Sequence, residues 1–325
     1  MNENTDYKIK SIKLGLDRLT LTVSPFNMAP YPNFPKELKS LAKFDDDITF
    51  AAPTAQAGYR VAVRLKISSV SADIWPLLQA DPYGKNSYFR LECNPNRLGP
   101  EGISEMKNII DNSTPHGWPL FTHSARASRI DVNIDAHGLP LGPILVRTPY
   151  PRYTEVWSQK GELELVGIGE PQTIYLGQKS KSKNLYRIYR LGPGKVEVGC
   201  TDATRFESVD GSTRPLLAQL HNYASPFGKL IVQSVFAPKP SDWADAHWRM
   251  LIRIACDHGL NVALKHLPKD ERKQAEKALA AVPIADFDLK QAWSQWPSLL
   301  ATLDFMKPGC GGTFLPGYCQ PKAAA

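Results

Sequence analysis

Apolar and polar residues alternate along much of the first two thirds of the chain, the pattern of β-strands that are buried on one face. Between residues 9 and 23 the alternation changes phase at Asp17 and Arg18, so this segment is either one strand with a bulge or two short strands. The predicted strands cover residues 9–23, 59–67, 87–94 and 127–138, with shorter strands inside 150–169 and 172–207.

Helical spacing of apolar residues predicts the other elements. Short helices are expected between the strands, at residues 36–44, 71–79, 100–111 and 140–148. From Pro215 onward the pattern is helical, with segments at 215–223, 242–258, 261–266, 269–281 and 289–305. The mixture predicts an α/β or α+β layer in a strand-rich domain, residues 1–236, followed by a helical region, residues 237–325, with a flexible Gly- and Pro-rich tail.

Charge points to a polyanionic partner. The 325 residues carry a net charge of +7, and the pI is near 9.0. On the strand at 59–67, Arg60, Arg64 and Lys66 share the polar face, which either contacts DNA or is simply solvated. The N-terminus is polar, and no apolar run approaches the ~20 residues of a membrane helix. We therefore expect a cytoplasmic protein without a membrane partner.

The strand at 127–138 has an unusual polar face. Isoleucine, valine and alanine face one side, while the other side carries Arg129, Asp131, Asn133, Asp135 and His137. Asp and Asn are depleted in strands, so this face suggests function; the alternative is an edge strand whose charges oppose aggregation. Residues four apart on a strand are about 13 Å apart at ~3.3 Å per residue. We expect one aspartate to bind a metal ion and the other to orient an arginine or bind DNA.

A second strand, around residues 184–190, carries two tyrosines on opposite faces. Tyr189 shares its face with Arg187, whereas Tyr186 does not. A tyrosine hydroxyl is a weak nucleophile until a cation or a metal ion polarises the phosphate that it attacks. Nearby groups that suit phosphate chemistry are the cations Lys179, Lys181 and Lys183 and the carboxylate Glu207.

Other chemistries have little support. The sequence has no His-x-His pair, so a histidine-held metal of the kind used by many nickases lacks obvious ligands. It has no GxxxxGK[ST] phosphate loop, and its five cysteines form no CxxC pair.

Three segments in this order, SRIDVNID, TIYLGQKSKSKNLYRIYR and TRFE, resemble the replication initiation factor family, the rolling-circle initiators of small plasmids and filamentous phages. The resemblance covers roughly residues 10–235. It implies an α+β, antiparallel-sheet Rep-type nicking fold with flanking helices, followed by a helical C-terminal subdomain. It also implies a metal-dependent endonuclease and strand transferase that nicks one strand at an origin, stays bound through a 5′-phosphotyrosine, leaves a 3′-OH and later rejoins the strand.

The same resemblance assigns roles to residues. Tyr189 would be the nucleophile, assisted by Arg187, and Asp131, Glu207 and Asp135 would hold Mg²⁺ or Mn²⁺. From their charge, and not from the resemblance, the residues expected to bind DNA are Lys179, Lys181, Lys183, Arg190, Arg129, Arg60, Arg64 and Lys66. The family often continues the tyrosine with an acidic residue, but Arg190 follows here. Either the metal set therefore differs from that of the family, or Tyr186 is the nucleophile.

The expected partners are a single-stranded or hairpin nick site, a host helicase and polymerase in a bacterial cytoplasm, and a second subunit. The alternative function is a non-catalytic DNA-binding regulator on the same scaffold. A third reading is a recombinase that uses the same tyrosine chemistry.

Overall fold

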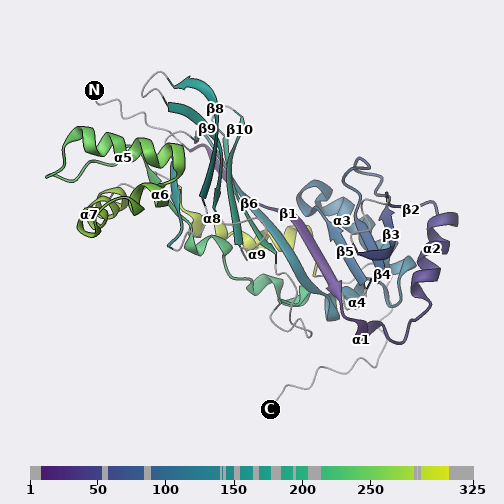
Figure 1. Ribbon diagram of the computed structural model, residues 1–325. Coiled ribbons are helices and arrows are strands. Elements are labelled where there is room, and N and C mark those ends of the chain that lie inside the picture. The colour runs from purple at the N-terminus through teal and green to yellow at the C-terminus, as the bar shows by residue number, and fades with distance from the viewer. Residues whose placement is uncertain are drawn as a thin grey trace, which may run out of the picture. The chain divides into compact units, whose positions relative to one another are not determined.

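The fold is mixed α+β with a large antiparallel sheet, shown as a computed structural model in Figure 1. The structure describes residues 9–52, 58–83, 89–139, 141, 144–149, 154–163, 168–176, 184–192, 195–203, 214–281, 284 and 287–306. The hydrogen-bonded strand order is β2-β3-β4-β5-β1-β6-β11-β10-β9-β8, and β12 and β7 form a separate pair. None of the described helices has the length and apolar composition needed to cross a membrane.

The chain forms two compact units, and β1 and β6 contribute to both. The Tyr189 unit comprises Met1–Arg18, Arg129–Val209 and Asn222–Leu299; the Trp118 unit comprises Leu19–Ser128, Asp210–His221 and Leu300–Ala325. The phase change at Asp17 and Arg18 thus coincides with the point where β1 passes from one unit to the other. The units do not divide at residue 236, and separate folding of 1–236 and 237–325 stays a prediction.

The Trp118 unit packs helices against a small antiparallel sheet. Its elements are β1 (Ser11–Val23, second half), α1 (Pro25–Met28), α2 (Phe34–Phe44), β2 (Ile48–Phe50), β3 (Tyr59–Leu65), β4 (Leu77–Pro82), β5 (Phe89–Cys93), α3 (Pro95–Ser113), α4 (Gly117–Ser124) and η2 (Leu217–Asn222). Phe89 contacts Phe34 and Phe121 at ring distances of 5.2 and 5.1 Å, and Trp118 stacks on Phe121. These fully buried aromatic rings form the centre of the core.

The Tyr189 unit carries the other half of the sheet. Its strands are β6 (Arg126–His137), β7 (Ile144–Arg147), β8 (Thr154–Leu163), β9 (Ile168–Leu176), β10 (Asn184–Gly192), β11 (Lys195–Ala203) and β12 (Ile231–Ser234). Its helices are η3 (Pro226–Lys229), α5 (Asp245–His258), α6 (Leu260–Lys265), α7 (Lys269–Ala280), α8 (Leu289–Trp293) and the first half of α9 (Trp296–Leu303).

One face of this half-sheet is apolar and buried. Ile134, Val198 and Ile188 lie on it, on neighbouring strands. Tyr186 belongs to the same face, and its hydroxyl donates to the carbonyl oxygen of Pro226, in η3, at 2.7 Å. Because side chains alternate along a strand, the opposite face receives Tyr189 and the acidic residues of β6.

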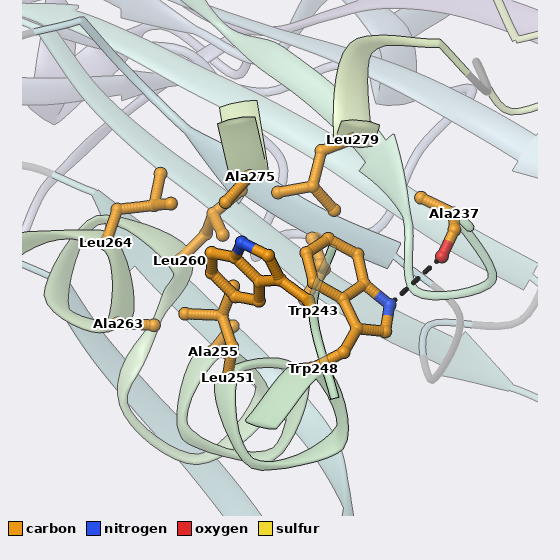
Figure 2. Close-up of a cluster of buried hydrophobic side chains, with 11 residues drawn as sticks. Ala237, Trp243, Trp248, Leu251, Ala255, Leu260, Ala263, Leu264, Ala275 and Leu279 are labelled. Atoms are coloured by element: carbon orange, nitrogen blue, oxygen red, sulfur yellow. Dashed lines mark hydrogen bonds between the residues drawn. The ribbon is translucent and has the colours of Figure 1, made fainter. Parts of the chain in front are cut away.

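The helices α5, α6 and α7 form a core of their own with β7 (Figures 1 and 2). Trp243 and Trp248 lie at its centre, with their rings 5.8 Å apart. The indole N–H of Trp248 donates to the buried carbonyl of Ala237 at 3.1 Å. Gly259 ends α5 at φ +91°, as the sequence predicted.

This hydrogen bond gives a stability prediction. Trp248→Phe keeps an aromatic ring but leaves the buried carbonyl of Ala237 without its donor, so we expect a loss of about 1–3 kcal/mol. Urea unfolding measures the change. The outcome that would contradict this account is a Trp248→Phe protein with the wild-type unfolding midpoint.

Two predicted helices are wrong. The segment 71–79 forms a turn followed by β4, because Pro76 disfavours helical geometry in the residue before it and Leu78 and Ala80 pair with the neighbouring strands. The segment 140–148 contains β7, a strand that pairs with β12. The sequence analysis also missed β12 and α4.

The structure also decides the position of the acidic strand. β6 lies between β1 and β11, so the edge-strand alternative is wrong. Within the Tyr189 unit, the amide of Lys10 donates to the carbonyl oxygen of His137 at 2.8 Å, and Asp135 pairs with Glu197 on the other side. An interior strand has no need of charges against aggregation, so its polar face calls for another explanation.

Candidate active site

Three polar side chains form a row across neighbouring strands of the Tyr189 unit. Tyr189 on β10 lies opposite Glu197 on β11, and Glu197 lies opposite Asp135 on β6. Directly paired residues of antiparallel strands point to the same face. The sheet register therefore brings a tyrosine and two carboxylates together, although 54 residues separate Asp135 from Tyr189 in the sequence.

Tyr189 is held between a carboxylate and a guanidinium. Glu197 lies directly opposite it in the sheet register, and the guanidinium carbon of Arg187 lies 4.9 Å from the centre of its ring. Burial, the facing carboxylate of Glu197 and the negative charge of Asp17 raise the pKa of Tyr189 well above its usual range; Arg187 acts in the opposite direction. Tyr189 is therefore protonated in this arrangement and needs an added positive charge to become a good nucleophile.

Glu197 is the most buried carboxylate of the row, with 5% of its surface exposed. The amide nitrogen of Asn133 lies 3.4 Å from its Oε2, and Nη2 of Arg187 lies 3.9 Å from its Oε1. Oε1 accepts no hydrogen bond from the part of the chain that the structure describes. Burial, Asp17 and Asp135 raise the pKa of Glu197, against the lowering effects of Tyr189 and Arg187.

The aspartates of β6 have different surroundings. Asp131 accepts two hydrogen bonds from Arg129, from Nε at 2.8 Å and from Nη2 at 2.6 Å. Asp135 accepts one from the amide of Asn133 at 3.1 Å and lies in the row with Glu197. Asp131 thus holds an arginine, as the sequence predicted for one of the two aspartates. The metal-binding role of Asp135 stays a prediction.

Four of the remaining candidates lie outside the described residues: Lys179, Lys181, Lys183 and Glu207. Arg190 is exposed and follows Tyr189 directly, so strand alternation directs it to the other face.

Arg60, Arg64 and Lys66 belong to the Trp118 unit. Arg60 pairs with Asp81 at 2.9 Å, and Arg64 donates to the carbonyl oxygen of Trp75 at 2.6 Å. Each of these two arginines therefore already has a protein acceptor, and their contact with DNA stays a prediction.

Sequence reasoning missed Glu197. The signal was present, because the segment LGPG at 191–194 is rich in turn residues and the strands on both sides have a hairpin pattern. Counting outward from such a turn places Tyr189 near Glu197, whereas the sequence analysis looked for the partner carboxylate at Glu207.

The carboxylate oxygens beside Tyr189 are of the kind that a hard divalent cation prefers as ligands. Glu197 and Asp135 offer carboxylate oxygens, and Oε1 of Glu197 is buried without a hydrogen-bond donor among the described residues. In the ranges that the structure describes, no three His, Cys, Asp or Glu side chains form a ready metal site. An ion would therefore have to draw these side chains closer together or take other ligands.

No family model, curated protein or solved structure matches this chain.

Proposed function

We propose that the chain is a DNA-nicking and strand-joining enzyme in which Tyr189 attacks a phosphodiester. The observation that carries this proposal is the row of Tyr189, Glu197 and Asp135, with Arg187 over the tyrosine ring. A phenol next to carboxylates and a guanidinium, on a polar sheet face, has the groups that phosphoryl transfer to a tyrosine requires.

Each side chain has a task in the reaction. As the bond between the tyrosine oxygen and phosphorus forms, Glu197, directly opposite Tyr189 in the sheet, accepts the hydroxyl proton. The bond from phosphorus to the 3′ oxygen breaks, and that oxygen takes a proton from water to give a 3′-OH. Arg187, half of whose side chain is exposed, is placed to neutralise phosphate oxygens. Rejoining follows the same steps in reverse.

A divalent ion, Mg²⁺ or Mn²⁺, would be held by Asp135, with Glu207 as the further ligand that the resemblance implies. When bound, it supplies the positive charge that counters the carboxylates around Tyr189 and polarises the phosphate. Asp131 is the weaker candidate ligand, because both of its oxygens already accept hydrogen bonds from Arg129.

The resemblance to rolling-circle initiators supports a specific setting for this chemistry. The enzyme would nick one strand at a replication origin in a bacterial cytoplasm, hand the 3′-OH to a host polymerase, and work with a host helicase or a second subunit. The basic net charge is consistent with a DNA partner.

Peptide mapping tests the proposal. Single-stranded oligonucleotides are incubated with the full chain and Mn²⁺, and the covalently linked peptide is found by mass spectrometry after trypsin and nuclease digestion. Trypsin separates the two tyrosines, because cleavage after Arg187 puts Tyr186 and Tyr189 in different peptides. We expect the nucleotide on Tyr189. A link to Tyr186, or no adduct with any origin-bearing strand, would refute the assignment.

One observation favours a second candidate, a non-catalytic DNA-binding protein on the same scaffold. The carboxylates that surround Tyr189 raise its pKa, which opposes nucleophilic attack unless a cation binds. Salt-sensitive DNA binding with no cleavage in saturating Mn²⁺ would favour this reading.

A further inference from the structure

A second tyrosine lies beside the row, on the side away from the carboxylates. Tyr175 on β9 is directly opposite Arg187 on β10, so both side chains belong to the face that carries Tyr189. Tyr175 is partly exposed, and its neighbour on the same face, Thr173, lies opposite Tyr189. Sequence analysis gave Tyr175 no role.

Arg187 connects the two tyrosines. Its guanidinium lies over the ring of Tyr189, and half of its side chain is exposed. An exposed guanidinium beside a partly exposed aromatic ring is the combination on which unpaired bases stack. The register therefore places a flat, cationic and aromatic surface, Tyr175 with Arg187, immediately beside the nucleophile.

Charge is distributed unevenly on the two sides of Tyr189. Towards β11 and β6 lie Glu197 and Asp135, which suit a metal-bound phosphate and offer nothing to an uncharged base. On β9 lie Thr173 and Tyr175, which carry no charge, and the register of the next strand, β8, pairs Glu155 with Tyr175. A nucleotide whose phosphate reaches the hydroxyl of Tyr189 would accordingly direct its base towards β9.

We propose that Tyr175 and Arg187 form a stacking site for an unpaired base next to the phosphate that Tyr189 attacks. The inference rests on the proposed function for its location, but base stacking itself needs no cleavage. Such a site requires the single-stranded nick site that the resemblance implies, because a paired base has both faces covered by its neighbours in the duplex.

Affinity measurements test the stacking site. The full chain binds fluorescent oligothymidylate without metal, and Tyr175→Ala is expected to weaken binding by about 5- to 150-fold, while Tyr175→Phe, which keeps the ring, stays near wild type. An abasic oligonucleotide of the same length has phosphates but no bases, so wild type and Tyr175→Ala should bind it equally. Equal losses on both oligonucleotides, or no loss on either, would overturn the proposal.

A matched control exists in the Trp118 unit. Tyr83 is 56% exposed, and Arg60 lies 5.0 Å from its ring centre, so Tyr83→Ala removes a similar pair that lies in the other unit. We expect no base-dependent loss from Tyr83→Ala. An equal base-dependent loss would show that any exposed Tyr–Arg pair behaves this way and would remove the case for a dedicated site at Tyr175.

Photocrosslinking separates this inference from the proposed function. Oligothymidylate with one 5-iodouracil is irradiated on the protein, and the crosslinked peptide is identified after trypsin digestion. Tyr175 is the only aromatic residue of the tryptic peptide 161–179. A crosslink there without any covalent adduct on Tyr189 would support the stacking site and count against the nickase. An adduct on Tyr189 with no crosslink in 161–179 would support the nickase and overturn the stacking site.

Discussion

Tyr189→Phe is expected to abolish the covalent protein–DNA adduct, with a fall in its rate of formation of about 10⁴-fold or more, because the attacking oxygen is removed. The ring remains in place, so the contact between Arg187 and its face is kept. DNA affinity should therefore change little. Single-turnover adduct formation with a labelled oligonucleotide in saturating Mn²⁺, resolved on a denaturing gel, measures the effect.

Tyr186→Phe is the matched control, since it removes a hydroxyl three residues away on the opposite face. That hydroxyl donates to the carbonyl oxygen of Pro226 in the buried layer, so its loss should cost about 1–3 kcal/mol of stability and leave adduct formation intact. If the adduct instead survives in Tyr189→Phe and disappears in a folded Tyr186→Phe protein, the two tyrosines have the opposite roles and the site lies on the other face.

The strands and their faces could be read from the sequence because alternation is a local signal. The alternation of β6 placed Ile134 in the core and Asp131 and Asp135 on the polar face, and the alternation of β10 separated Tyr186 from Tyr189. Both predictions are confirmed. Position in the sheet is not local, so the sequence could not tell that β6 lies in its interior.

Local sequence patterns gave the wrong secondary structure where pairing with a distant strand decides it. Leu77–Pro82 and Ile144–Arg147 are short apolar segments that are compatible with either a helix or a strand, and each is a strand because a neighbouring strand pairs with it. Glu197 was overlooked for a similar reason. The LGPG turn could have paired it with Tyr189 on β10, but its second partner, Asp135 on β6, is distant in the sequence and has no local signal.

Glu197→Gln should make the folded protein more stable at neutral pH. Burial and neighbouring carboxylates raise the pKa of Glu197 in the folded state above its value of about 4.3 in an unfolded chain. The folded state thus binds the proton more tightly, and the stability of the wild type falls as pH rises from about 4.3 through the folded pKa. The glutamine variant lacks this loss. Its melting temperature should exceed that of wild type at pH 7 and match it near pH 3; a less stable variant at pH 7 would contradict the account.

The same substitution should impair the reaction. Glutamine keeps the size of the side chain but cannot accept the tyrosine proton, so adduct formation should fall by about 10²-fold or more. Without metal, the pKa of Tyr189 should fall, because the neighbouring negative charge that raises it is gone; carbon-13 NMR of labelled tyrosine, assigned with Tyr189→Phe, measures this. We expect all three results together: higher stability, a lower pKa of Tyr189 and slower adduct formation. They would mean that the buried carboxylate of Glu197 serves the reaction and destabilises the fold. If activity is unchanged, Glu197 merely neighbours the nucleophile, and the proton of Tyr189 must leave by another route.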